Sequence, residues 1–154
     1  MSSLVNVDKA NSDTFRAMLG VEKSLMKGTI EKSLRLLIEL RVSQINGCAY
    51  CIDMHWKDAR AAGETEQRLY GLPAWRESPY YSGRERAGLL IAEELTRVAD
   101  RPLPEEVHQH ARDNFNNQEL CDLAWTIAAI NCWNRVNIGL RTVPGSYQAA
   151  GAFH

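Results

Sequence analysis

Three reactive side chains fall close together in the stretch GCAYCIDMH, namely those of Cys48, Cys51 and His55. In a helix that begins at Cys48, Cys51 lies one turn further along on the same face, so the two sulfurs can form a disulfide without large backbone movement. His55 follows Cys51 by another helical turn, where its imidazole can accept the thiol proton or stabilise the thiolate. The spacing therefore predicts reversible thiol chemistry.

The residues give each of the two sulfurs a reason to be the reactive one. Cys48, at the start of a helix, would feel the partial positive charge of free backbone N–H groups, which favours the thiolate. Cys51 would instead be assisted by His55. A thiolate that attacks a peroxide becomes a sulfenic acid, and the neighbouring thiol condenses with it to a disulfide and water. Our working assignment makes Cys51 the attacking and Cys48 the resolving cysteine, with an external dithiol that resets the pair.

Glu39 is the carboxylate that we add to this candidate site. A carboxylate beside a Cys–His pair can orient the imidazole or accept a proton through water. Arg35 lies four residues earlier, however, and an ordinary ion pair on one helix face explains Glu39 equally well. Both interpretations remain open at this point.

A structural zinc site is the main chemical rival of a redox pair. Cys48, Cys51 and His55 supply three ligand types, whereas structural zinc needs four, and the sequence holds no second C-x-x-C and no H-x-x-x-H pair. The remaining cysteines, Cys121 and Cys132, lie in a nearly continuous apolar segment and are expected to be buried core thiols. We therefore expect no metal and no bound cofactor.

Length and charge place few other constraints on function. The chain has 154 residues, which suits one domain over 1–154, and carries 18 basic against 19 acidic residues. No long run of one charge suggests nucleic acid or an anionic membrane as a partner. The first residues lack the pattern of a signal peptide, and no stretch approaches 18 apolar residues. We expect a soluble, cytoplasmic protein.

Helical periodicity runs along the whole chain, and no alternating strand pattern interrupts it. Capping residues and breakers predict about six or seven helices, over residues 12–27, 30–45, 48–62, 65–70, 82–99, 104–115 and 117–141. Thr29 is an expected cap, capping boxes are expected at Ser82 with Glu85 and at Asn116 with Glu119, and Gly47 is expected to end a helix in a left-handed turn. The fold class is therefore all-α, a single-domain bundle with the C-x-x-C at a helix N-terminus, followed by a tail over 143–154. Because no strand precedes Cys48, a thioredoxin-like fold is excluded.

Three separated motifs resemble one known family. They are SQINGCAYC followed by Met54 and His55, then ARAAGETEQRLY, and later A-x-N-x-W-N-R at residues 129–135. In this order they resemble the AhpD-like alkylhydroperoxidases of the carboxymuconolactone decarboxylase superfamily, over residues of about 10–142. The resemblance implies an AhpD-like all-α fold, homo-oligomers, and an antioxidant peroxidase whose donor is a thiol or a lipoylated protein.

Carried over by position, Cys48 and Cys51 match the family's redox pair and His55 its relay histidine. The well-described branch has its relay glutamate where this chain has Leu36, and a histidine between the cysteines where Tyr50 stands. Glu39 is thus the tentative relay carboxylate. The presence of both cysteines argues against lactone decarboxylation by a decarboxylase-related protein. A non-enzymatic redox sensor or interaction module on the same scaffold is the alternative to the enzyme.

Overall fold

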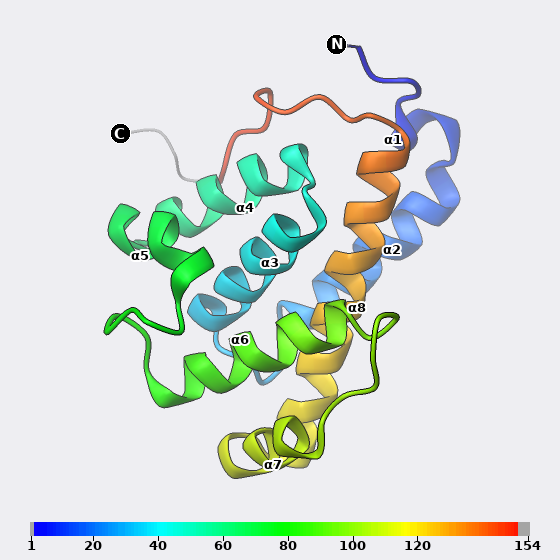
Figure 1. Cartoon of the computed structure of the whole chain (residues 1–154). Coiled ribbons are helices and arrows are strands. Elements are labelled where there is room, and N and C mark those ends of the chain that lie inside the picture. The colour runs from blue at the N-terminus through cyan, green and yellow to red at the C-terminus, as the bar shows by residue number, and fades with distance from the viewer. Residues whose placement is uncertain (1, 151–154) are drawn as a thin grey trace.

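The computed structural model describes residues 2–150 of the chain and is helical along its length (Figure 1). The expected all-α bundle is confirmed, while the last four residues of the predicted tail lie outside the described part. The elements are α1 (Val7–Ala10), α2 (Ser12–Leu25), α3 (Lys32–Asn46), α4 (Ala49–Ala61), α5 (Glu66–Gly71), a 3-10 turn (Leu72–Ala74), α6 (Gly83–Thr96), α7 (Glu105–Asn114) and α8 (Asn117–Gly139).

Helix α3 is the centre of the bundle, because it packs against α4, α6 and α8 (Figure 1). One side of α3 contributes Leu34, Ile38 and Val42 to a core shared with α6, α7 and α8. The other side contributes Leu36, Leu37 and Leu40 to a core shared with α4, α5 and the loop before α6. Burial on both sides leaves α3 only a narrow polar stripe.

Helix ends follow the capping residues in most places. The expected capping boxes at Ser82 with Glu85 and at Asn116 with Glu119 are both present, and each begins a helix. The expected cap at Thr29 is wrong, because α3 begins at Lys32 without a side-chain cap. Thr29 instead donates from its backbone N and its Oγ1 to Asp122 Oδ2 of α8, at 2.7 and 2.8 Å. A charged carboxylate is a stronger hydrogen-bond acceptor than a neutral group, so Asp122 accepts from both donors of Thr29.

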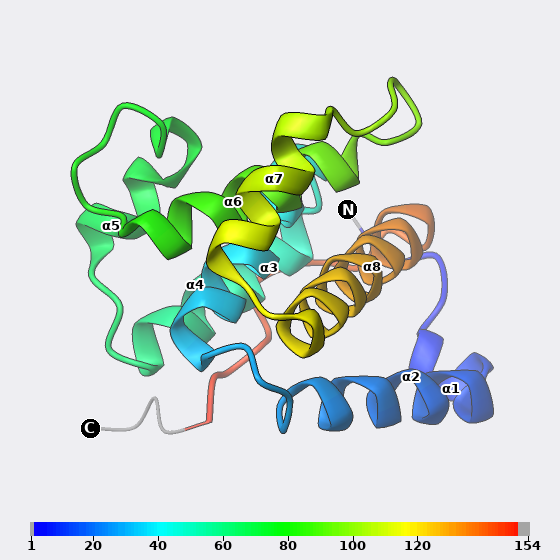
Figure 2. The ribbon, with the colours of Figure 1, turned by 90° about the horizontal axis from the view of Figure 1, so that it is seen from below.

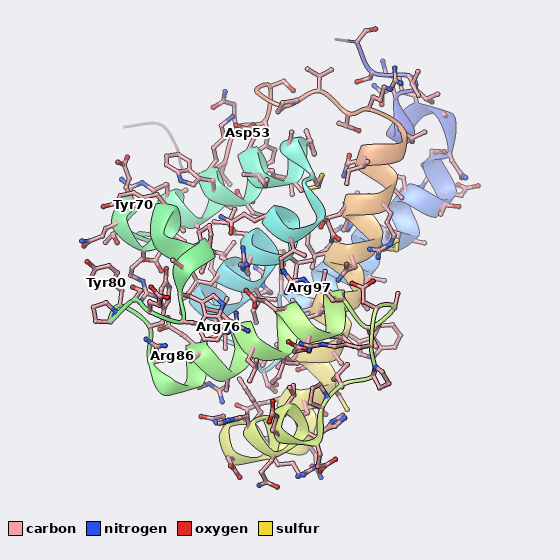
Figure 3. The ribbon with its side chains drawn as sticks, in the orientation of Figure 1. Asp53, Tyr70, Arg76, Tyr80, Arg86 and Arg97 are labelled. Carbon is pink, nitrogen blue, oxygen red and sulfur yellow. A yellow bond between two sulfur atoms is a disulfide. The ribbon has the colours of Figure 1, made fainter. Side chains whose placement is uncertain are left out.

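The aromatic loop before α6 is folded into the core. Trp75 and Tyr81 are buried, whereas Tyr80, the third aromatic residue of the loop, is 41% exposed. The indole Nε1 of Trp75 donates to the buried Glu93 at 2.9 Å, and Arg41 Nε of α3 donates to the same carboxylate at 2.6 Å. Arg76 also pairs with Glu93, and Figure 3 shows its side chain along α6. Glu93 thereby joins α3, the loop and α6.

Helix α8 is less central than its sequence suggested. Cys121 and Cys132 were expected in the core, but both are exposed. Trp125, on the same side of the helix, is 62% exposed. The opposite face of α8, with Leu123, Ile127 and Ile130, packs in the core. Because apolar residues occur all around α8, its hydrophobic periodicity does not distinguish the buried face from the exposed face.

Helix α2 lies on the outside of the bundle, where Figure 2 shows it running beside α8. It contributes no fully buried side chain, although it carries several large apolar ones. None of the helices in residues 2–150 is both long enough and apolar enough to cross a bilayer.

The close approach of α6 to α3 generates a stability prediction. A Cβ at Gly88 would lie 3.0 Å from Leu34 Cδ1, which is fully buried and has little room to move. Gly88→Ala should therefore lower the free energy of unfolding by about 1–3 kcal/mol through overpacking. Urea denaturation measures the change.

Gly20→Ala is the matched control, since a Cβ at this α2 position meets nothing within 4 Å. It should raise the free energy of unfolding by about 0.5–1 kcal/mol, because alanine is the better helix former. Equal stabilisation by both substitutions would contradict the close contact between α3 and α6.

Candidate active site

A sharp turn between α3 and α4 places the two cysteines. Gly47 ends α3 with a φ of 69°, a left-handed conformation in which glycine is favoured. Cys48 then caps α4, and its Sγ accepts a hydrogen bond from the backbone N of Cys51 at 3.3 Å. The turn reverses the chain, so α4 packs back along α3 (Figure 1).

Cys48 and Cys51 are joined by a disulfide, with their Cα atoms 5.3 Å apart. Figure 3 shows the yellow sulfur bond at the start of α4. Both cysteines are buried, with only 1% of each residue exposed to solvent. Cys51 lines the cavity described below, and its Sγ lies 3.6 Å from Asn137 Nδ2 of α8. The spacing of the pair therefore permits the reversible disulfide that the sequence suggested.

Glu39 comes to lie between Arg35 and His55. Its Oε1 accepts a hydrogen bond from Arg35 Nη1 at 2.7 Å, which is the ion pair expected from helical spacing. Its Oε2 lies 3.3 Å from His55 Nδ1, one helix away on α4. Glu39 thus makes both of the contacts considered from the sequence, the ion pair with Arg35 through Oε1 and the contact with His55 through Oε2.

The charge on Glu39 is held by its neighbours. The side chain is only 4% exposed, and burial alone would raise its pKa. The charges of His55 and Arg35, together with the hydrogen bond from Arg35, outweigh burial and hold the pKa of Glu39 below its usual value. Glu39 is therefore ionised at neutral pH.

Three buried atoms in this cluster lack a hydrogen bond with any described residue. They are Glu39 Oε2 and both ring nitrogens of His55, whose contact with Glu39 lacks hydrogen-bond geometry. Each unpaired buried polar atom costs about 1–3 kcal/mol, so such atoms are rare in folded proteins. Their concentration at one place makes this cluster the candidate functional site.

A cavity of about 860 Å³ opens beside this cluster. Helices α2, α3, α4 and α8 and the C-terminal segment form its walls, which are largely apolar. Its lining includes Phe15, Leu19, Met26, Leu36, Met54, Ile130, Trp133 and Val143, together with the polar Glu22, Lys32, Arg35, Glu39, Tyr50, Cys51, His55, Asp58 and Asn137. A cavity of this size holds a whole small molecule.

The C-terminal segment closes one side of the cavity. Gly145 N donates to Asp53 Oδ2 at 3.0 Å, and Figure 3 shows Asp53 where this segment crosses α4. Lys57 Nζ bridges Asp53 and the Tyr147 carbonyl, at 2.8 and 3.1 Å. The Tyr147 hydroxyl donates to Asp58 at 2.7 Å. The segment over residues 143–150 is therefore docked on α4.

Polar residues of α8 support the cysteine turn from behind. Asn134 Oδ1 accepts from Asn46 Nδ2 at 2.8 Å, and Asn134 Nδ2 donates to Ser43 Oγ at 3.1 Å. These contacts pair the polar groups of Asn134, which lies in an otherwise apolar helix. Arg135 is exposed and donates to Asn131, not to Glu39 or Asp53.

Sequence reasoning missed Asn137 and Glu22, which both line the cavity. Asn137 contacts the Cys51 sulfur, and Glu22 accepts a hydrogen bond from Trp133 Nε1 at 2.8 Å. No local pattern distinguishes these residues from surface or core positions. In residues 2–150, no three His, Cys, Asp or Glu side chains are grouped so that they could hold a metal ion.

Comparisons with known proteins agree with this architecture. The uncharacterized protein YdfG of Bacillus subtilis is 40% identical over 140 residues, which cover 91% of this chain and 95% of that one. A crystal structure from Agrobacterium tumefaciens superimposes with a TM-score of 0.91 at 35% identity, over 95% of this chain and all of the other. That protein has no known function and has been suggested to be the antioxidant defence protein AhpD.

An uncharacterized peroxidase-related protein from Silicibacter matches less closely. Its TM-score is 0.79 at 26% identity, over 88% of this chain and 72% of the other. The model of the carboxymuconolactone decarboxylase family matches residues 12–94, which include α3, the cysteine turn and α4. With its AhpD-like fold and its C-x-x-C pair, the chain belongs to the carboxymuconolactone decarboxylase family.

Proposed function

We propose that the protein is a thiol-dependent peroxidase that reduces hydroperoxides through a Cys48/Cys51 dithiol–disulfide cycle. One observation carries this proposal: the Cys51 side of a disulfide-forming pair faces a cavity beside the buried Glu39–His55 cluster. Two similar solved structures support this class of reaction. One has been suggested to be AhpD, and the other is described as peroxidase-related. The external reductant is a small dithiol or a lipoylated protein.

Each step of the proposed cycle uses groups at the site. The Cys51 thiolate attacks the terminal oxygen of the hydroperoxide, the O–O bond breaks, and the alkoxide leaves as an alcohol once it is protonated. The Cys48 thiol then attacks the sulfenic sulfur of Cys51, which forms the disulfide and releases water. The external dithiol reduces this disulfide by exchange and becomes a disulfide itself.

His55 and Glu39 have distinct parts in this proposal. His55 takes the proton from the Cys51 thiol, since its imidazole follows Cys51 by one turn on the same helix. The ionised Glu39 faces His55 Nδ1 and stabilises the imidazolium that forms. Asn137 Nδ2, 3.6 Å from Cys51 Sγ, adds a donor that favours the thiolate.

The expected homo-oligomer belongs to the same proposal. Its support is the exposed face of α8, where Cys121, Trp125 and Cys132 lie without a covering element in the described chain. Large exposed apolar side chains on one helix face are typical of protein interfaces.

A dithiol-coupled peroxidase assay tests the proposed function. The wild-type protein should turn over cumene hydroperoxide many times with dihydrolipoamide or dithiothreitol as donor. Cys48→Ser and Cys51→Ser should each abolish the cycle, because the disulfide can no longer form. The double variant Cys121→Ser/Cys132→Ser is the matched control and should keep the wild-type rate, since both thiols lie on α8 outside the cavity lining. A single oxidation that never cycles would instead favour the redox sensor.

Sulfenic acid trapping tells the two cysteines apart. In a background without Cys121 and Cys132, whose exposed thiols would also react, a dimedone probe should label the Cys48→Ser protein after one equivalent of hydroperoxide. The label should lie on Cys51, which lines the cavity. Labelling of the Cys51→Ser protein alone, located by mass spectrometry, would reverse our assignment.

Glu39→Gln tests the relay carboxylate. It should slow oxidation of Cys51 by about 10²-fold, the lower range for loss of a proton-transfer group. Glu94→Gln is the matched control, because Glu94, on α6, is likewise a buried carboxylate held by an arginine, Arg101, but lies outside the cavity lining. Rapid-mixing kinetics on the reduced proteins gives the rates. A wild-type rate in Glu39→Gln would reduce Glu39 to a structural ion pair.

The stability difference between the wild-type protein and Glu39→Gln should depend on pH. Because the folded-state pKa of Glu39 lies below 4.5, its ionised form stabilises the fold above that pH and the contribution is lost as the pH falls further. The stability difference between wild type and Glu39→Gln should therefore shrink in acid, as measured by urea denaturation.

A further inference from the structure

The leaving group of the proposed reaction needs a proton of its own. When the Cys51 thiolate attacks an alkyl hydroperoxide, the departing oxygen is an alkoxide, which is a strong base. Displacement at oxygen is in line, so the departing oxygen points away from the attacking sulfur. An acid that protonates it must therefore lie across the cavity from Cys51.

Helix α2 forms that facing wall. It packs on α8, and Figure 2 shows α2 and α8 together on one side with α3 and α4 on the other. Phe15, Leu19 and Glu22 line the cavity from α2, at positions that share one helix face. Glu22 is the ionisable member of this otherwise apolar wall.

Glu22 is held in place by one hydrogen bond. Its Oε1 accepts from Trp133 Nε1 at 2.8 Å, and Trp133 is itself packed edge-on against Phe15 with ring centroids 5.7 Å apart. Glu22 forms no ion pair with any of the described residues, so its second oxygen is available to a molecule in the cavity. A carboxyl held this way can donate a proton without first moving.

The surroundings of Glu22 favour its protonated form. Burial and the negative charge of Glu39 raise the pKa of Glu22, and the Trp133 hydrogen bond, His55 and Arg35 do not offset them. The ionisable groups that share the cavity with Glu22 are Lys32, Arg35, Glu39, Tyr50, His55, Asp58, Tyr147 and, in the reduced protein, Cys51. Asp58 is occupied by the Tyr147 hydroxyl and Glu39 by Arg35.

We propose that Glu22 is the general acid that protonates the leaving alkoxide of an alkyl hydroperoxide, a role that rests on the proposed peroxidase function. In this step the S–O bond forms on Cys51 as the O–O bond breaks. The Glu22 proton passes to the departing oxygen, so that the products are the sulfenic acid, an alcohol and the Glu22 carboxylate. Glu22 regains a proton from water before the next turnover.

Leaving-group basicity provides the test. tert-Butyl hydroperoxide releases a basic alkoxide, whereas peracetic acid releases acetate, a weak base that leaves without a proton. Glu22→Gln keeps an oxygen that can accept from Trp133 but has no acidic proton. In a Cys48→Ser/Cys121→Ser/Cys132→Ser background, it should slow oxidation of Cys51 by tert-butyl hydroperoxide about 10²-fold and leave the peracetic acid rate unchanged. In the parent protein, the ratio of the two rates should fall as the pH rises through the titration of Glu22.

Two further variants separate an acid from a structural residue. Asp13→Asn, an exposed carboxylate of α2 outside the cavity lining, is the control and should change neither rate. Trp133→Phe removes the hydrogen bond to Glu22 but leaves Glu22 its acidic proton. A selective loss of the rate with the alkyl hydroperoxide is therefore expected in Glu22→Gln and not in Trp133→Phe. Equal slowing of both peroxides in Glu22→Gln, or no slowing of either, would overturn the role of Glu22 as general acid and leave the proposed peroxidase function standing. Failure of both peroxides to oxidise the parent protein would overturn the peroxidase function, and the role of Glu22 with it.

Discussion

A buried carboxylate must be paired or protonated, and much of this structure follows from how Glu39 is paired. Its partners come from two helices: Arg35 one turn earlier on α3, and His55 on α4. The second contact exists only because Gly47 turns the chain back so that α4 packs along α3. The turn that places a charge partner beside Glu39 is also the turn that places Cys48 at the start of a helix.

The core and the candidate site share the same central helix. Most of α3 is buried among apolar side chains on two sides, and its remaining stripe, with Lys32, Arg35 and Glu39, lines the cavity. Movement of α3 would therefore disturb packing and chemistry together. By contrast, α2 adds no fully buried side chain, and its place at the cavity depends on contacts such as Glu22 and Phe15 with Trp133.

The chain differs from the well-described branch of its family at two positions beside the cysteines. Leu36 occupies the place of the branch's relay glutamate and lines the cavity as an apolar residue. Glu39, about one turn further along α3, contacts His55. Tyr50 lies between the cysteines, and burial followed by the nearby charges of Asp53 and Asp58 raises the pKa of its phenol. In the proposed function, the relay carboxylate thus comes from a different turn of the same helix.

Local patterns in the sequence determined what depends on near neighbours along the chain: the helices, both capping boxes, the glycine turn and the juxtaposition of Cys48, Cys51 and His55. Only the tertiary structure decided what depends on packing between distant segments. It chose which face of α8 is exposed, and so corrected the expectation for Cys121 and Cys132. It turned Thr29 from a cap into a partner of Asp122, and it brought Glu22 and Asn137 to the cavity. Periodicity reports how many sides of a helix are apolar, whereas the neighbours that cover those sides are set by the fold as a whole.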